Sequence, residues 1–175
     1  MRLNDWLLSE LDLEAACTRR HLERVPMDRL EFKPHDKSMT LGWLTTFLAV
    51  IPTWGGFTLT RDSFDAAPEG SQPPKREVVR SSDQLLTLFD GNVADVRAAL
   101  SRASDEHLAA PWSLLAAGTT IFTRPRFLVF ETYFLHHMVH HRAQLGVYLR
   151  LLGVAVPAVY SGSADEQGGI FVSFP

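Results

Sequence analysis

Histidines are the residues of this sequence whose spacing could do chemistry. Four of the seven lie in one short run, His136-His137-Met138-Val139-His140-His141. Residues four apart on a helix lie one turn above each other on the same face, so the run holds two pairs, His136 with His140 and His137 with His141. Two imidazoles one turn apart can chelate a divalent metal ion, and imidazole suits Zn, Ni, Cu and Fe. The alternative is a run without a metal, with buried histidines hydrogen-bonded to neighbours and exposed ones at the surface.

The apolar residues around the run indicate which pair faces the interior. They recur at spacings of three and four and form one stripe with a histidine in it: Phe130, Phe134, Met138, His141, Leu145, Tyr148 and Leu152. His141 lies on this stripe and His137 at its edge, which predicts that this pair points inward and that His136 and His140 are peripheral. A competing stripe through Tyr133, His136 and His140 is also fairly apolar, so spacing alone leaves the other orientation open.

Four amphipathic segments must position these histidines. They predict helices near residues 4–25, 38–60, 82–104 and 126–152. Pro26 ends the first, Pro52 should kink or end the second, and Gly153 closes the last. Residues 110–124 depart from the helical period and are expected to form a short irregular or two-stranded insertion. The expected fold class is all-α, a four-helix bundle in a single domain over residues 1–175. The two later connections are long enough to cross the bundle, so a simple up-down-up-down order need not hold.

Composition narrows the class of protein. An apolar fraction of 46%, a charged fraction of 21% and a formal net charge of −3 are typical of a soluble globular protein. Lys and Arg are neither in excess nor clustered, which argues against a nucleic-acid-binding surface. No stretch of 18 apolar residues indicates a membrane span. The single Cys17 rules out an internal disulfide, and acidic residues interrupt any N-terminal signal peptide, so a cytoplasmic location is expected.

The sequence around the histidine pair resembles a known family. His137-Met-Val-His-His141-Arg142-Ala143-Gln144 is similar to the His-x-x-x-His-Arg-Gly-Gln signature of the DinB/YfiT-like family, with Ala143 where the family often has Gly. Weaker similarities follow in the expected order at 38–44, 51–54, 111–112 and 147–166. Each motif alone is weak, but together they cover residues from about 5 to 166.

The resemblance implies a four-helix bundle that is often a homodimer. It also implies a divalent metal (Zn, Ni or Fe) held by three histidines, two from the His-x-x-x-His and one from the second helix. Carried over to this chain, the two ligands are His137 and His141. Relatives include thiol-dependent transferases that use low-molecular-weight thiols, and a metal can stabilise a thiolate at neutral pH. The resemblance therefore implies a metal-dependent enzyme, either a thiol-dependent S-transferase-like or a hydrolase-like one, with a small molecule or a low-molecular-weight thiol as partner.

The third ligand of that pattern is missing here. Counting from Met39-Thr-Leu-Gly-Trp-Leu and Ile51-Pro, the histidine of the second helix should fall at position 47, which is Phe47. A phenyl ring cannot coordinate a metal and would fill the pocket. His35 is the nearest substitute ligand, with an exposed loop histidine as its alternative. Two hypotheses remain: an enzyme with a weak or absent metal, or a non-catalytic bundle that has lost the metal and serves as a small-ligand-binding or structural dimer. Arg142 and Gln144 either orient the histidines or only pack.

Overall fold

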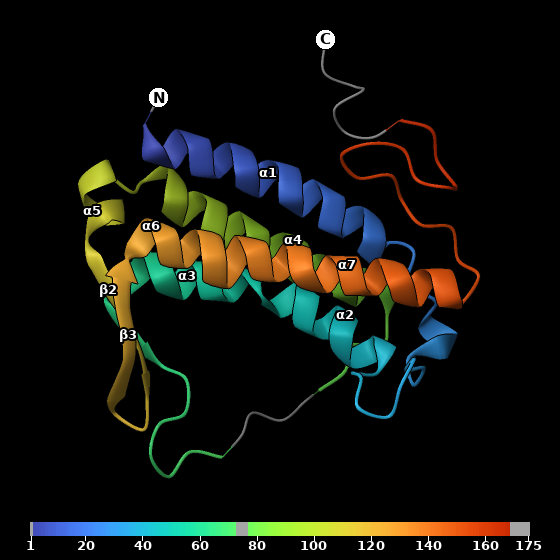
Figure 1. The fold of residues 1–175 in the computed structure, drawn as a ribbon, viewed down its shortest axis with the longest axis horizontal. Coiled ribbons are helices and arrows are strands. Elements are labelled where there is room, and N and C mark those ends of the chain that lie inside the picture. The colour runs from blue at the N-terminus through green and yellow to red at the C-terminus, as the bar shows by residue number, and fades with distance from the viewer. Residues whose placement is uncertain (1, 73–76, 169–175) are drawn as a thin grey trace.

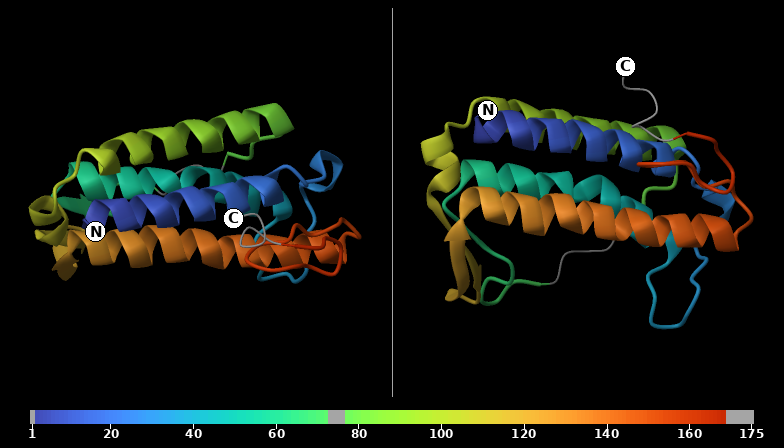
Figure 2. Two further views of the ribbon diagram at one scale, coloured as in Figure 1. Left: turned by 90° about the horizontal axis from the view of Figure 1, so that it is seen from above. Right: turned by 45° about the horizontal axis from the view of Figure 1, so that its top comes forward.

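Four helical rods run along a common long axis (Figures 1 and 2). The computed structural model describes residues 2–72 and 77–168. The rods are α1 (Leu3–Leu22), α2 (Leu41–Val50) with α3 (Pro52–Thr60), α4 (Ser82–Ser101), and α6 (Arg126–Val129) with a π-helical segment (η2, Phe130–Leu135) and α7 (His136–Leu151). The predicted bundle is thus present. Its rods run up, down, down and up in chain order, because α3 ends and α4 begins at opposite ends of the bundle (Figure 1).

A small sheet lies at one end of the bundle (Figure 1). The predicted insertion is an antiparallel hairpin of β2 (Pro111–Ala116) and β3 (Thr119–Pro125), preceded by the short helix α5 (Asp105–Ala109). A third strand, β1 (Ser63–Asp65), pairs with β2 in parallel, with Phe64 opposite Leu114. The all-α class is therefore corrected to a mostly helical bundle with a three-stranded sheet. Three residues are too few to show a strand period, so the sequence of β1 resembled a loop.

Proline and the cap residue set the bounds of the second rod. The predicted helix over 38–60 is divided, because Pro52 lacks an amide hydrogen and begins α3 instead of continuing α2. The rod begins at Leu41, where the hydroxyl of Thr40 accepts a hydrogen bond from the amide of Trp43 at 3.2 Å. This start and this division place Phe47 on α2 and Trp54 on α3, on the two sides of Pro52. A short 3₁₀ turn, η1 (Met27–Arg29), precedes the rod.

The last rod differs from a regular helix at one place. Residues Phe130–Leu135 are π-helical, and the histidine run begins directly after them. The four-residue spacing of Phe130, Phe134 and Met138 fits either kind of helix, so the sequence did not reveal this segment. The stripe is buried nonetheless, with Phe130, Phe134, Met138 and Leu145 at 0% exposure. Among residues 2–72 and 77–168, no helix is both long enough and apolar enough to cross a membrane.

A buried arginine joins the sheet to the bundle. The side chain of Arg126, 1% exposed, donates hydrogen bonds to the carbonyls of Thr58 (2.5 Å), Arg61 (2.5 Å) and His107 (3.2 Å) and to the carboxylate of Asp62 (2.9 Å). The carbonyls at the end of α3 are the negative end of the helix dipole and accept a cation well. This contact fixes the end of α3 against α5 and the start of α6.

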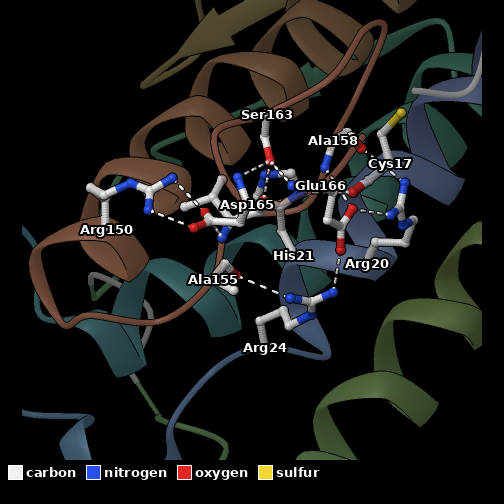
Figure 3. A network of polar contacts seen from close by, with 11 residues as sticks. Cys17, Arg20, His21, Arg24, Arg150, Ala155, Ala158, Ser163, Asp165 and Glu166 are labelled. Carbon is white, nitrogen blue, oxygen red and sulfur yellow. Dashed lines mark hydrogen bonds and ion pairs between the residues drawn. The ribbon is translucent and has the colours of Figure 1, made fainter. Parts of the chain in front are cut away.

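The C-terminal segment is held on α1 and α7 by charged contacts (Figure 3). Arg20 of α1 and Arg24, just after its end, both donate to the carboxylate of Glu166 at 2.5 Å, and Arg150 of α7 donates to that of Asp165 at 2.5 Å. The amides of Ala158 and Val156 donate to the same two carboxylates. These hydrogen bonds lower the pKa of both acids, which stay charged and attached at neutral pH.

The close packing around Gly55 leads to a first testable prediction, on stability. A Cβ on Gly55 of α3 would lie 2.6 Å from the ring of Phe134 and 2.8 Å from Val96, whereas one on Gly91 of α4 would meet nothing within 4 Å. Gly55→Ala should cost about 1–3 kcal/mol of unfolding free energy through overpacking. Gly91→Ala, the matched control, should gain up to about 1 kcal/mol of helix propensity. Urea denaturation measures both, and a Gly55→Ala protein as stable as wild type would contradict the close packing of α3.

The burial of His21 leads to a second prediction, on how stability depends on pH. It is 3% exposed, its Nδ1 lies 2.9 Å from the carbonyl of Cys17, and burial lowers its pKa. The unfolded chain takes up a proton near pH 6.5, whereas the folded chain does so only at lower pH, so stability should fall as pH decreases below about 6.5. Unfolding free energies at pH 7 and pH 5.5 should differ less in His21→Gln than in wild type or in the exposed control Thr87→Ala. An equal difference in all three would show that His21 does not titrate in this way.

Candidate functional site

The pair His137–His141 faces the interior, as the stripe predicted. His141 is 5% exposed and His137 is half-buried, whereas His136 and His140 are exposed. The two inward rings converge, with their Nε2 atoms 2.8 Å apart. Two nitrogen ligands of one Zn ion, each at about 2.0–2.1 Å, lie about 3 Å apart or slightly more. The spacing of the pair is therefore close to that of a chelating pair.

Gln144 holds His141 in one orientation. Its Oε1 lies 2.8 Å from His141 Nδ1, and its Nε2 lies 3.1 Å from Nε2 of His140. An amide oxygen can only accept, so Nδ1 of His141 carries the hydrogen and its Nε2 presents a lone pair towards His137. Gln144 therefore orients the pair. Arg142 does not orient the pair, because its buried guanidinium points to α1 and pairs with the carboxylate of Glu14. The same guanidinium donates a hydrogen bond to the hydroxyl of Tyr160, in the segment after α7, at 2.8 Å.

Burial keeps both imidazoles uncharged. Desolvation is the main cause that lowers the pKa of both His137 and His141. The proximity of His140 acts in the same direction on both rings. Since unperturbed histidine has a pKa near 6.5, both rings are neutral at pH 7. At that pH they are hydrogen-bonding groups and potential metal ligands rather than cations.

Phe47 occupies the side of the pair from which a third ligand would come. Its ring packs edge-on against His141 and His137, with centroid distances of 5.0 and 5.7 Å. Trp43 stacks on the outer side of Phe47 at 5.7 Å, and Trp54 lies 5.1 Å from His137. The imidazoles thus meet aromatic rings, not further ligands, on the side of α2 and α3.

A three-ligand metal site does not fit these residues. In the part of the chain that the structure describes, no three His, Cys, Asp or Glu residues lie together in a way that could hold a metal ion. His35, the substitute considered from the sequence, is exposed and its Nδ1 accepts a hydrogen bond from the amide of Lys37 at 3.1 Å. The pair alone could offer two nitrogens, and Phe47 would lie against any ion bound there.

His137 also forms part of the wall of a neighbouring pocket. The cavity has a volume of about 240 Å³ and lies between α3, the sheet and the π-helical segment. Five aromatic side chains surround it: Trp54, Phe57, Phe64, Trp112 and Tyr133. Thr58 and Val129 form buried parts of the wall, and none of the described residues that line the cavity is charged at neutral pH. The arrangement is an uncharged, aromatic pocket with an imidazole at one side.

Sequence reasoning missed this pocket. Trp54 and Trp112 stood out only as motif positions, and Phe64 lies in a segment interpreted as a loop. Phe64 stacks on Phe57 of α3, with centroids 5.1 Å apart and ring planes within 17°. To predict this contact, one would have had to match Phe57 inside α3 with Phe64 beyond its end. The segment between them gave no periodic pattern that would bring them together.

The comparisons with known proteins agree with this fold. The family model of the DinB family matches residues 2–168. Among solved structures, the DinB-like protein YjoA of Bacillus subtilis is 17% identical with a TM-score of 0.66, covering 93% of this chain and 99% of its own. YfiT of Bacillus subtilis, described as a probable metal-dependent hydrolase with an unusual four-helix bundle topology, is 17% identical with a TM-score of 0.58. The match covers 87% of this chain and 89% of YfiT.

A third solved structure is a mycothiol-dependent maleylpyruvate isomerase. It is 16% identical with a TM-score of 0.53, and the alignment covers 87% of this chain and 62% of that one. None of the curated proteins matches this chain. At these identities the structures show a shared fold, and the family model supplies the membership. On the match over residues 2–168, this chain belongs to the DinB family.

Proposed function

We propose that this DinB-family protein binds a small molecule at its uncharged histidine pair and the adjoining aromatic pocket, and that its affinity for metal is weak. The observation that carries the proposal is the position of Phe47, whose ring packs against both imidazoles where a third ligand would be needed. Two neutral imidazoles hold a divalent ion less firmly than three. A phenyl ring beside them also displaces the water that would complete the coordination shell.

Two features support ligand binding over a purely structural role: the aromatic cavity and the fixed orientation of His141. A concave, largely apolar cavity with few polar groups is the usual form of a small-molecule site. The hydrogen bond that Nδ1 of His141 donates to Gln144 fixes the orientation of His141 next to His137, which lines that cavity. Because the rings are neutral, they suit an uncharged ligand or one that exchanges hydrogen bonds with imidazole.

Restoring the missing imidazole tests the proposal. Zn titrated into untagged protein by calorimetry at about pH 7.5, where imidazole is mostly neutral, should bind weakly to wild type. Phe47→His should bind at least about tenfold more tightly, roughly 1.4 kcal/mol, because the new ring faces the pair that Phe47 now contacts. Two controls accompany it. Phe57→His adds a histidine to the pocket wall away from the pair, and Phe47→His with His141→Gln removes one of the pair; both should stay weak.

Two outcomes of this titration would change the conclusion. Tight, stoichiometric binding by wild type would mean that another residue supplies the third ligand, with His35 first among the candidates, and would favour an enzyme. No binding by either wild type or Phe47→His would mean that the pair is not accessible to an ion, and the metal hypothesis should be dropped.

A metal- and thiol-dependent enzyme is the second candidate. It is favoured by the 2.8 Å approach of the two Nε2 atoms and by the hydrogen bond of Gln144, both of which suit ligands held ready for an ion. Two proteins of similar structure are described as a probable metal-dependent hydrolase and a mycothiol-dependent isomerase, and those activities belong to those proteins. This candidate needs the third ligand that Phe47 does not provide, so it depends on the first of the two outcomes above.

A further inference from the structure

Two neighbouring cavities lie between the small sheet and the last rod. The inner pocket is the aromatic one, and its sheet residues are Phe64, Trp112 and Leu114 of β1 and β2. The second cavity, the outer groove, has a volume of about 310 Å³, and its sheet residues are Phe122 and Arg124 of β3. Leu114 is the register partner of both Phe64 and Phe122, and Trp112 is that of Arg124. Partners across a ladder point to the same side, so one face of the sheet lines both cavities.

Tyr133 of the π-helical segment forms part of the wall between these two cavities. Its side chain lines both of them, as does that of Val129, which is 2% exposed. On the side of the outer groove, the ring of Tyr133 packs against Phe122 with a centroid distance of 4.9 Å. Tyr133 is nevertheless 45% exposed, so its ring can be removed without opening the core of the bundle. Its removal should join the inner pocket to the outer groove.

The inner pocket offers no partner to an ion. None of the described residues that line it is charged at neutral pH. The hydroxyl of Thr58 donates to the carbonyl of Trp54 at 2.9 Å, and Nε2 of His137 lies 2.8 Å from Nε2 of His141. A carboxylate or ammonium group would therefore lose its hydration without gaining a partner. The outer groove differs, because the guanidinium-bearing Arg124 lines it.

The volume of the inner pocket sets the size of its occupant. A dry apolar cavity of about 150 Å³ holds one benzene molecule. The inner pocket, at about 240 Å³, is larger by roughly half. It has room for one substituted ring, whereas a second separate ring would have to take the place of Tyr133. The five aromatic side chains around it offer edge-on and stacked contacts to an aromatic ring.

From these observations we infer that the inner pocket binds an uncharged molecule the size of one substituted aromatic ring, and that Tyr133 sets this size limit by separating the pocket from the outer groove. The inference rests on the proposed small-molecule function. It adds the charge, the chemical class and the size of the ligand, and it makes Tyr133 the residue that determines specificity for size.

Three probes test the class of ligand. Ethylbenzene is uncharged and has one ring, benzoate has a similar shape and a negative charge, and diphenylmethane is uncharged and has two rings. Dissociation constants are measured by NMR titrations that follow the methyl signals of the protein. Ethylbenzene should bind wild type at least about tenfold more tightly than benzoate, because the anion loses its hydration in the pocket. It should also bind at least about tenfold more tightly than diphenylmethane, because the second ring does not fit.

Substitution of Tyr133 tests the size limit. Tyr133→Ala should raise the affinity for diphenylmethane at least about tenfold, because the second ring then enters the outer groove. The affinity for ethylbenzene should change by less than about threefold. Tyr133→Phe, the matched control, keeps the ring and should keep the wild-type preference. Circular dichroism and thermal unfolding confirm that both variants are folded.

Two leucines report where the probes bind. Of the two cavities, Leu114 lines the inner pocket and Leu128 lines the outer groove. Ethylbenzene bound to wild type should show nuclear Overhauser contacts to the methyl groups of Leu114 and none to those of Leu128. Diphenylmethane bound to Tyr133→Ala should show contacts to both.

Each outcome decides one point. If ethylbenzene does not bind wild type, the pocket is not a site for such ligands, and the small-molecule part of the proposed function fails with it. If it binds without contact to Leu114, it binds elsewhere and the inference is overturned. If it binds beside Leu114 and benzoate binds as tightly, the proposed function stands and the inferred ligand class is wrong. If Tyr133→Ala leaves the size preference unchanged, the proposed function again stands and the role of Tyr133 is wrong.

Discussion

The buried guanidinium of Arg126 is the contact on which the functional end of this bundle depends. It satisfies the carbonyls at the end of α3 and the carbonyl of His107, and so ties together the three elements that meet there. The sheet continues directly from these elements, since β1 follows α3 and β3 leads into Arg126. The pocket walls come from the same parts of the chain. A neutral side chain at position 126 would leave several carbonyls without a donor, and removing a buried, hydrogen-bonded charge is among the costliest substitutions in a protein interior.

The histidine pair on the last rod faces the ring of Phe47 on α2, at the place where a third metal ligand would be needed. The histidine pair has the spacing and the supporting hydrogen bond of a metal-binding pair, yet Phe47 lies against both rings. Partial burial of the pair lowers the pKa of both imidazoles and keeps them neutral. The protein therefore combines a family-like histidine motif on α7 with an α2 that provides packing instead of a ligand. This combination is the basis of the proposed binding role, which does not need the metal.

Much of the bundle could be predicted because its signals are local. Helical periodicity placed the rods, Pro52 divided the second, and the stripe through Phe134, Met138 and His141 gave the inward pair. The register of the family motif placed Phe47 against that pair, and the ring distances confirm it. The third strand, the π-helical segment and the pocket were not predicted. The third strand and the pocket arise from contacts between residues far apart in the chain. The π-helical segment is local, but it keeps the four-residue spacing of its apolar residues and so leaves no trace in the pattern.

The sequence by itself determined that the chain forms a helical bundle and that position 47 carries no ligand, because these depend on helical period and residue type. It favoured His137 and His141 as the inward pair, and the structure decided between the two orientations. Only the tertiary structure decided what surrounds the pair. The stacking of Phe64 on Phe57, the pairing of β1 with β2 and the unpaired indole of Trp112 require the end of α3 and the sheet to meet. Side chains brought together from separate segments form a pocket whose shape no single segment contains, since packing is a property of the assembled interior.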